Sequence, residues 1–194
     1  MANELERNEM TRTTITMCCV LLGATWLLVG CGQTPAPPAP TAKALAPKID
    51  GTKFVLTEEP AEAKTVDEVR EAAKDGDDIV IVGRIGGDRD PWVAERAAFL
   101  IVDPSRIPCS ERKGDSCKTP WDYCCETDLA KSKATIKFVD DAGKTLANDA
   151  RQLLNVKELQ TVVVKGQAKR DEAGNLTVLA SGLFVRPNSE VKAE

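Results

Sequence analysis

The sequence contains no histidine, and this absence excludes many functions. Ser-His-Asp and Cys-His catalysis, HExxH zinc sites and histidine-ligated haem all need an imidazole. Aromatic residues make up only 4% of the chain and the formal net charge is -4. Nucleic-acid binding needs clustered basic residues and, for single strands, aromatic stacking platforms. We therefore expect a protein that is not an enzyme and that has no nucleic-acid partner.

The length of 194 residues predicts one domain with an appendage. A content of 42% hydrophobic and 29% charged residues is typical of a globular chain. The appendage is at the N-terminus, where residues 15–29 form an uncharged apolar run. A membrane-spanning helix needs about 20 apolar residues. The shorter run is typical of the central region of a secretory signal, so residues 1–30 are predicted to be a signal peptide.

Residues 28–31 read Leu-Val-Gly-Cys, which resembles the lipobox of bacterial lipoprotein signals. The resemblance implies that Cys31 is diacylated and becomes the N-terminus after cleavage. Two acyl chains anchor a protein stably to a membrane without crossing it. The protein is therefore expected in the bacterial cell envelope, with its domain in the periplasm or outside the cell. Gly32 in place of an Asp favours the outer membrane if the cell is Gram-negative.

Residues 31–48 contain the lipidated cysteine and a proline-rich segment. Such segments favour extended polyproline II structure and act as semi-rigid spacers, here with a reach on the order of 50 Å. We interpret this segment as a stalk. Residues 49–188 are then the folded domain, and residues 189–194 are a polar tail.

Within the domain, short runs rich in β-branched residues predict strands. Thr65 and Glu68 form a capping-box pattern that predicts a helix over 66–74, and a second short helix is predicted within 149–159. Gly83 suggests a bulge or sharp bend, and a turn at 171–175 predicts a hairpin. The predicted strands are 53–57, 79–85, 97–103, 135–139, 161–168 and 176–185.

From residue 79 onward the expected order is three strands, a short helix and two strands, which is typical of a five-stranded Greek-key barrel of the OB type. The phrases IVIVGRI and VVVKGQAKRDEAGNLTVLASGLFV are similar to the first strand and final hairpin of small bacterial OB-fold domains. The expected fold is mainly β: an OB-like barrel with one or two short helices and a disulfide-rich loop insertion. A β-sandwich or another meander barrel remains an alternative.

The predicted insertion, residues 104–132, contains Cys109, Cys117, Cys124 and Cys125. Export to an oxidising compartment favours two disulfides. Pairing the adjacent Cys124 and Cys125 would be strained, which leaves two pairings open. A four-thiolate zinc or iron–sulphur site is the alternative, although the paired C-x2-C spacing of zinc sites is absent. A thiol-redox role would normally use C-x-x-C, which is also absent.

Trp121 and Tyr123 lie beside these cysteines, in the string KTPWDYCCE. They can pack on the disulfides or form an exposed recognition tip. The string is similar to planctomycete-type lipoproteins, a resemblance that implies no activity. The sequence thus predicts a lipid-anchored envelope protein whose OB-like domain is structural or binds a protein or small ligand, with no catalytic residue and no cofactor. The alternative is a lipoprotein whose four cysteines bind a metal or perform thiol-redox chemistry.

Overall fold

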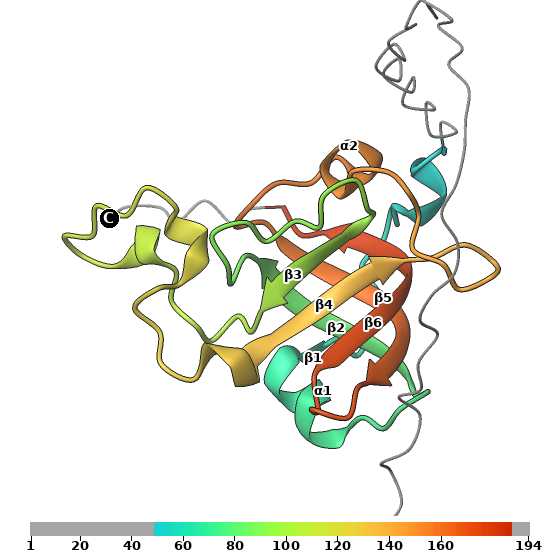
Figure 1. The fold of residues 1–194 in the computed structure, drawn as a ribbon, viewed down its shortest axis with the longest axis horizontal. Coiled ribbons are helices and arrows are strands. Elements are labelled where there is room, and N and C mark those ends of the chain that lie inside the picture. Colours follow the sequence, from blue (N-terminus) through green and yellow to red (C-terminus); the bar gives the residue numbers. More distant parts are fainter. Residues whose placement is uncertain (1–48, 188–194) are drawn as a thin grey trace, which may run out of the picture. The chain divides into compact units, whose positions relative to one another are not determined.

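The computed structural model describes residues 49–187. The predicted signal peptide, Cys31, the stalk and the tail lie outside the described residues. The elements of the domain are shown in Figure 1. They are β1 (Lys64–Thr65), α1 (Val66–Ala72), β2 (Asp78–Ile85), β3 (Ala98–Val102), β4 (Lys133–Phe138), α2 (Ala150–Leu154), β5 (Thr161–Arg170) and β6 (Leu176–Val185).

Strands β2 to β6 form a closed five-stranded barrel. The sheet order is β1-β2-β3-β4-β6-β5, and pairing of β2 with β5 completes the circle. The β4–β6 pair is parallel, whereas the other pairs of the barrel are antiparallel. With α2 between β4 and β5, this arrangement confirms the predicted OB-like barrel over a sandwich. Within residues 49–187, no helix has the length and apolar character needed to cross a bilayer.

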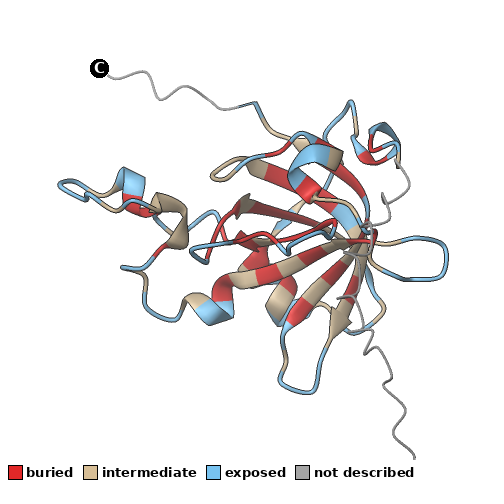
Figure 2. Cartoon of the chain, turned by 45° about the horizontal axis from the view of Figure 1, so that its top comes forward, coloured by how far each residue is buried: buried red, intermediate tan, exposed pale blue. Residues whose placement is uncertain are grey.

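The barrel interior is filled by alternate residues of the strands, coloured red in Figure 2. In β4, Ala134, Ile136 and Phe138 point inward and their neighbours are only partly buried. The Phe138 ring packs edge-on against Phe54, with 5.1 Å between the centroids. Phe99 is fully buried. Of the three phenylalanines that the sequence places among aliphatic residues, Phe99 and Phe138 are therefore core residues, whereas Phe184 is only partly buried.

The capping box of α1 is confirmed. Thr65 N–H donates to Glu68 Oε2 at 2.7 Å, and Thr65 Oγ1 accepts from Glu68 N–H at 3.3 Å. The helix ends at Ala72, two residues earlier than expected. Arg170 at the end of β5 donates to the carbonyl oxygens of the last turn, and so satisfies groups that a helix end leaves free.

Two local predictions are wrong. Residues 53–57 do not form a strand. A 3₁₀ turn over Thr52–Phe54 directs Phe54 into the core, and only Val55 bridges to β6. The strand irregularity lies at Gly166, not at Gly83. Gly83 instead permits close packing, because a Cβ there would lie 2.8 Å from Ile101 Cδ1.

Candidate functional site: the cysteine loop

The cysteine loop, residues 104–132, connects β3 to β4 and projects from one side of the barrel (Figure 1). Its ends are held together, because Asp103 N–H donates to the Ser132 carbonyl oxygen at 2.9 Å. Three 3₁₀ turns give it internal structure: Cys109–Glu111, Pro120–Asp122 and Leu129–Ser132. The loop is therefore an ordered insertion in the barrel.

The segment around Trp121 is seated directly on the barrel backbone. Gly87 N–H donates to the Trp121 carbonyl oxygen at 2.7 Å, and Trp121 Nε1 donates to the Arg89 carbonyl at 3.1 Å. A Cβ at Gly86 would lie 2.5 Å from the Trp121 carbonyl oxygen, so only glycine leaves room for this contact. The glycines that follow β2 thus provide the seat of the loop.

Tyr123 anchors the loop from within. Its side chain is only 1% exposed, although its backbone is left-handed, with φ of 57°. Burial raises the pKa of Tyr123 to about 12, an effect that Arg84 partly opposes. Tyr123 is therefore not part of an exposed recognition tip, because its buried ring is not available to a partner. Trp121 is half-buried and remains the candidate residue of that tip.

Two ion pairs brace the base of the loop. Arg84 of β2 pairs with Glu111 at 2.6 Å, and Arg112 pairs with Glu126. The second pair is the more protected, because the Glu126 side chain is 14% exposed. These pairs join the first and last parts of the loop to each other and to β2. The three cysteines that lie between Arg112 and Glu126 in the chain are thus enclosed by the second ion pair.

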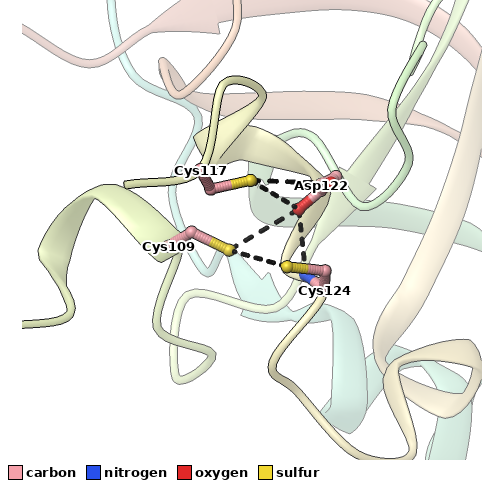
Figure 3. A group of neighbouring side chains, drawn as sticks. All are labelled: Cys109, Cys117, Asp122 and Cys124. Carbon is pink, nitrogen blue, oxygen red and sulfur yellow. Dashed lines mark hydrogen bonds between the residues drawn. The ribbon is translucent and has the colours of Figure 1, made fainter. Parts of the chain in front are cut away.

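Three thiols and one carboxylate converge inside the loop: Cys109, Cys117, Cys124 and Asp122, here called the sulfur cluster (Figure 3). Their sulfur and oxygen atoms lie within 4.8 Å of one another. Cys109 Sγ is 3.5 Å from Cys124 Sγ and 3.5 Å from Asp122 Oδ1. Cys117 Sγ lies 3.9 Å from each carboxylate oxygen of Asp122.

Asp122 is the residue that the sequence reasoning missed. Its Oδ1 accepts from Cys124 N–H at 2.9 Å and its Oδ2 accepts from Thr119 Oγ1 at 3.0 Å. Burial alone would raise the pKa of Asp122, but these two hydrogen bonds outweigh burial and lower it. The carboxylate is therefore ionised at neutral pH and fixed against the thiols. The available signal was an Asp two positions before a cysteine, a common turn pattern.

Cys125 lies outside the sulfur cluster. Its Sγ lies 4.0 Å from Asp115 Oδ2 and 3.9 Å from Cys124 Sγ, and Cys125 and Asp115 form a second group with Cys109. Both Cys125 and Asp115 are exposed, whereas Cys109 is buried. The four predicted cysteine ligands are thus brought together unequally: three join Asp122, and the fourth joins Asp115 and Cys109.

The predicted disulfides are not confirmed. The four cysteines are free thiols in the structure, and the 3.5 Å between the Cys109 and Cys124 sulfurs far exceeds a bonded length of about 2.05 Å. Cys109 and Cys124 also lack the lowered pKa of reactive cysteines. Burial raises the pKa of Cys109, and hydrogen bonding with Cys109 and Cys125 raises that of Cys124. The geometry therefore favours metal binding over thiol-redox chemistry.

No protein-family model and no curated protein matches this chain. A function is therefore proposed below from the geometry of the cysteine loop and the character of the barrel.

Proposed function

We propose that this protein is a lipid-anchored, non-catalytic protein of the bacterial envelope whose OB-like barrel presents the cysteine loop as a binding element. The observation that carries the proposal is the fixed seating of the loop. Gly87 holds the Trp121 carbonyl, Tyr123 is buried beneath the loop, and the sulfur cluster lies beyond them. Binding elements are commonly loops held on a rigid scaffold.

The barrel surface supports a non-nucleic-acid partner. OB domains that bind single strands stack bases on aromatic side chains along a basic groove. Here Phe99 and Phe138 are fully buried in the core, and the chain is acidic overall. Trp92 is 8% exposed and its indole N–H donates to Glu158 at 2.6 Å, so it offers no free face. We therefore propose a protein or small ligand as the partner.

The anchoring half of the proposal rests on the lipobox at residues 28–31 and the proline-rich stalk at 31–48. Two acyl chains on Cys31 would hold the mature protein at the membrane. The stalk would place the loop tens of ångströms from the lipid, on the order of 50 Å when extended. If the cell is Gram-negative, Gly32 makes the outer membrane the proposed location.

The test compares two full-length variants in a bacterial host fed a radiolabelled fatty acid. Cys31→Ser is expected to abolish labelling and to leave the protein as unprocessed precursor. Cys19→Ser is the matched control, because it removes a thiol from the predicted signal region outside the lipobox. It is expected to be labelled and membrane-bound like the wild type. Unlabelled wild-type protein, or labelling that survives in Cys31→Ser, would overturn the anchoring proposal.

The binding half is tested by removing the loop. A full-length variant in which residues 106–130 are replaced by a short Gly/Ser linker is expected to keep the barrel's far-UV circular dichroism. Crosslinking in whole cells, through a photoreactive residue placed at Lys118 on the loop, should give a defined adduct. The same residue placed at Lys144, in the turn after β4, is the control and should give none. Equal crosslinking at both positions would contradict the loop as the binding element.

A further inference from the structure

We propose that the sulfur cluster is a tetrahedral site for one thiophilic divalent metal ion, of which zinc has the best-matched chemistry. The inference names the ligand class of the cysteine loop and so rests on the proposed function, in which that loop binds. It replaces the four-thiolate set suggested by the sequence with three thiolates and the carboxylate of Asp122.

Three of the six distances between the ligand atoms are close to the edges of a tetrahedron around zinc. Bonds of about 2.3 Å to sulfur and 2.0–2.2 Å to oxygen imply edges of about 3.8 Å between sulfurs and about 3.5 Å between sulfur and oxygen. Cys109 Sγ lies 3.5 Å from Cys124 Sγ and 3.5 Å from Asp122 Oδ1, and Cys117 lies 3.9 Å from that carboxylate. All four ligand atoms lie within 4.8 Å of one another.

The ligand set with Asp122 also avoids a site in which the adjacent Cys124 and Cys125 bind the same metal ion. Two adjacent cysteines cannot easily occupy neighbouring vertices of one tetrahedron, which weakens a site made from Cys124 and Cys125 together. The structure places Asp122 in the fourth position instead, and the left-handed Tyr123 between them turns Cys124 back toward it. Thiolates exclude hard ions such as Ca²⁺ and Mg²⁺ and favour zinc-like ions.

The charge distribution points to a cation. The two oxygens of Asp122 accept from Cys124 N–H and Thr119 Oγ1, as the oxygens of supported metal ligands do. An anion fixed against three thiols disfavours their ionisation unless a positive ion lies among them. When one divalent ion binds, three thiol protons leave and four anionic ligands remain, giving a site of net charge −2. The carboxylate is therefore explained by a metal and is not needed by disulfides.

The arrangement of the thiols disfavours one of the two open disulfide pairings, whereas the other, Cys109 with Cys125 and Cys117 with Cys124, joins sulfurs within 4.8 Å and is tested by the mass measurement below. Joining Cys109 to Cys124 would leave Cys117 and Cys125 to pair. These two thiols instead face different carboxylates, Cys117 at Asp122 and Cys125 at Asp115. Because the proposed site is closed by four protein ligands, it is of the structural kind that stabilises a fold. The metal would order the loop, and metal loss would loosen it.

The experiment uses full-length protein purified from membranes in detergent, under argon, after chelation and reduction. Titration with Co²⁺ is expected to saturate at one ion per chain, with the visible bands of tetrahedral cobalt and a sulfur-to-cobalt charge-transfer band. Zn²⁺ should displace the Co²⁺. Elemental analysis of the protein before chelation should find about one zinc per chain.

Three variants separate this site from a disulfide framework. Cys117→Ser should lose the charge-transfer intensity of one thiolate and bind Co²⁺ at least tenfold more weakly. Asp122→Asn keeps one oxygen to accept from Cys124 N–H but loses the anion, and should also bind at least tenfold more weakly. Cys125→Ser is the matched control and should bind like the wild type. Far-UV circular dichroism of each metal-free variant reports whether the barrel is intact.

The inference is overturned by any of three results: no stoichiometric binding, wild-type affinity in Asp122→Asn, or equal loss in Cys125→Ser and Cys117→Ser. An air-purified protein without metal whose mass is four hydrogens lower than the reduced form would establish two disulfides and also overturn it. The anchoring test depends only on Cys31, so failure of the metal site and failure of the anchor are distinguishable.

Discussion

The carbonyl oxygen of Trp121 lies against Gly86, so closely that a Cβ on Gly86 would approach it to 2.5 Å. The same Cβ would lie 2.9 Å from Cε2 of the Tyr123 ring. Real Cβ contacts of this kind do not occur without movement, and the nearest atom belongs to the backbone. The seat of the cysteine loop therefore depends on the absence of one methyl group.

We expect Gly86→Ala to displace the loop and to lower the free energy of unfolding by about 1–3 kcal/mol, the usual cost of overpacking. Cobalt affinity should fall as well, because Asp122 follows Trp121 directly. Gly143→Ala is the control: its backbone φ is 76° but no atom lies within 4 Å of the added Cβ. Urea denaturation measures the free energy of unfolding of the two variants, and Co²⁺ titration measures their metal affinity. Equal effects of the two substitutions would show that the seat is not sterically tight.

Tyr123 contributes through its ring and not through its hydroxyl group. The hydroxyl has no hydrogen-bond partner in the described part of the chain, although the side chain is buried. Tyr123→Phe should change stability by less than about 1 kcal/mol, whereas Tyr123→Ala should cost about 3–5 kcal/mol, as for other buried aromatics. Chemical denaturation compares the pair. A large loss in Tyr123→Phe would point to a hydroxyl contact and contradict this assignment.

Asp103 links the start of the loop to α1 and gives the domain a pH dependence. Its buried carboxylate accepts N–H bonds from Asp67 at 2.8 Å and Ser105 at 2.9 Å. Burial would raise the pKa of Asp103, but these bonds outweigh burial and hold it below its ordinary value of 3.8. The resulting stabilisation is present above pH 3.8 and is lost as the pH falls through the lowered value.

Asp103→Asn should therefore cost about 1.5–3 kcal/mol at neutral pH, the range for hydrogen bonds to charged groups. The difference from the wild type should shrink as the pH falls below 3.8. Asp141→Asn, an exposed position in the turn after β4, is the control and should have no effect. Thermal melts from pH 7 down to pH 3 test this, and a constant difference across the range would refute the electrostatic explanation.

Arg170 joins the end of β5 to the last turn of α1. Its guanidinium donates to the carbonyl oxygens of Ala73 at 3.0 Å and Val69 at 3.4 Å, and to that of Arg70. Arg170→Ala should cost about 1.5–3 kcal/mol. Arg170→Lys should recover only part of this, because an ammonium group keeps the charge but lacks the planar fork.

The matched control for Arg170 is Lys131→Ala, which removes a solvent-exposed ion pair with Asp128 at 3.6 Å. Exposed pairs are worth about 0–1 kcal/mol, so little change is expected. Equilibrium denaturation of Arg170→Ala, Arg170→Lys and Lys131→Ala measures the loss of unfolding free energy in each. If Arg170→Lys matched the wild type, the charge alone would account for the contribution of Arg170.

The strands and the barrel were predictable because local pattern and tertiary fold agree. Runs such as 79–85 are β-branched and short, and the capping box at Thr65 needs only nearby residues. The sequence did not predict the strand Lys64–Thr65, because two residues are too few to show an alternating pattern. Their parallel pairing with β2 is a tertiary contact that the local sequence does not encode. Phe54 was assigned to a strand because its packing on Phe138 is a long-range contact that spacing does not encode.

The site was predictable only in part. The four cysteines identified the loop, but their sequence spacing suggested that all four act together. Asp122 lies beside three of them because the 3₁₀ turn Pro120–Asp122 and the left-handed backbone of Tyr123 reverse the chain between Asp122 and Cys124. Sequence composition does not reveal this local conformation. Packing of Tyr123 beside the cysteines was one of the two alternatives from the sequence, but its exposure of only 1% could not be foreseen, since its neighbours in the sequence are polar or exposed.

The clamp between Asp103 N–H and the Ser132 carbonyl oxygen makes the cysteine loop leave and re-enter the barrel at one point. An insertion closed in this way adds little entropic cost as it lengthens, since each doubling of loop length costs only about 0.6 kcal/mol. Barrel assembly through β3 and β4 then need not wait for the loop to acquire its ligand. We therefore expect that the loop can be transferred into another barrel, provided that the recipient has two glycines in the place of Gly86 and Gly87.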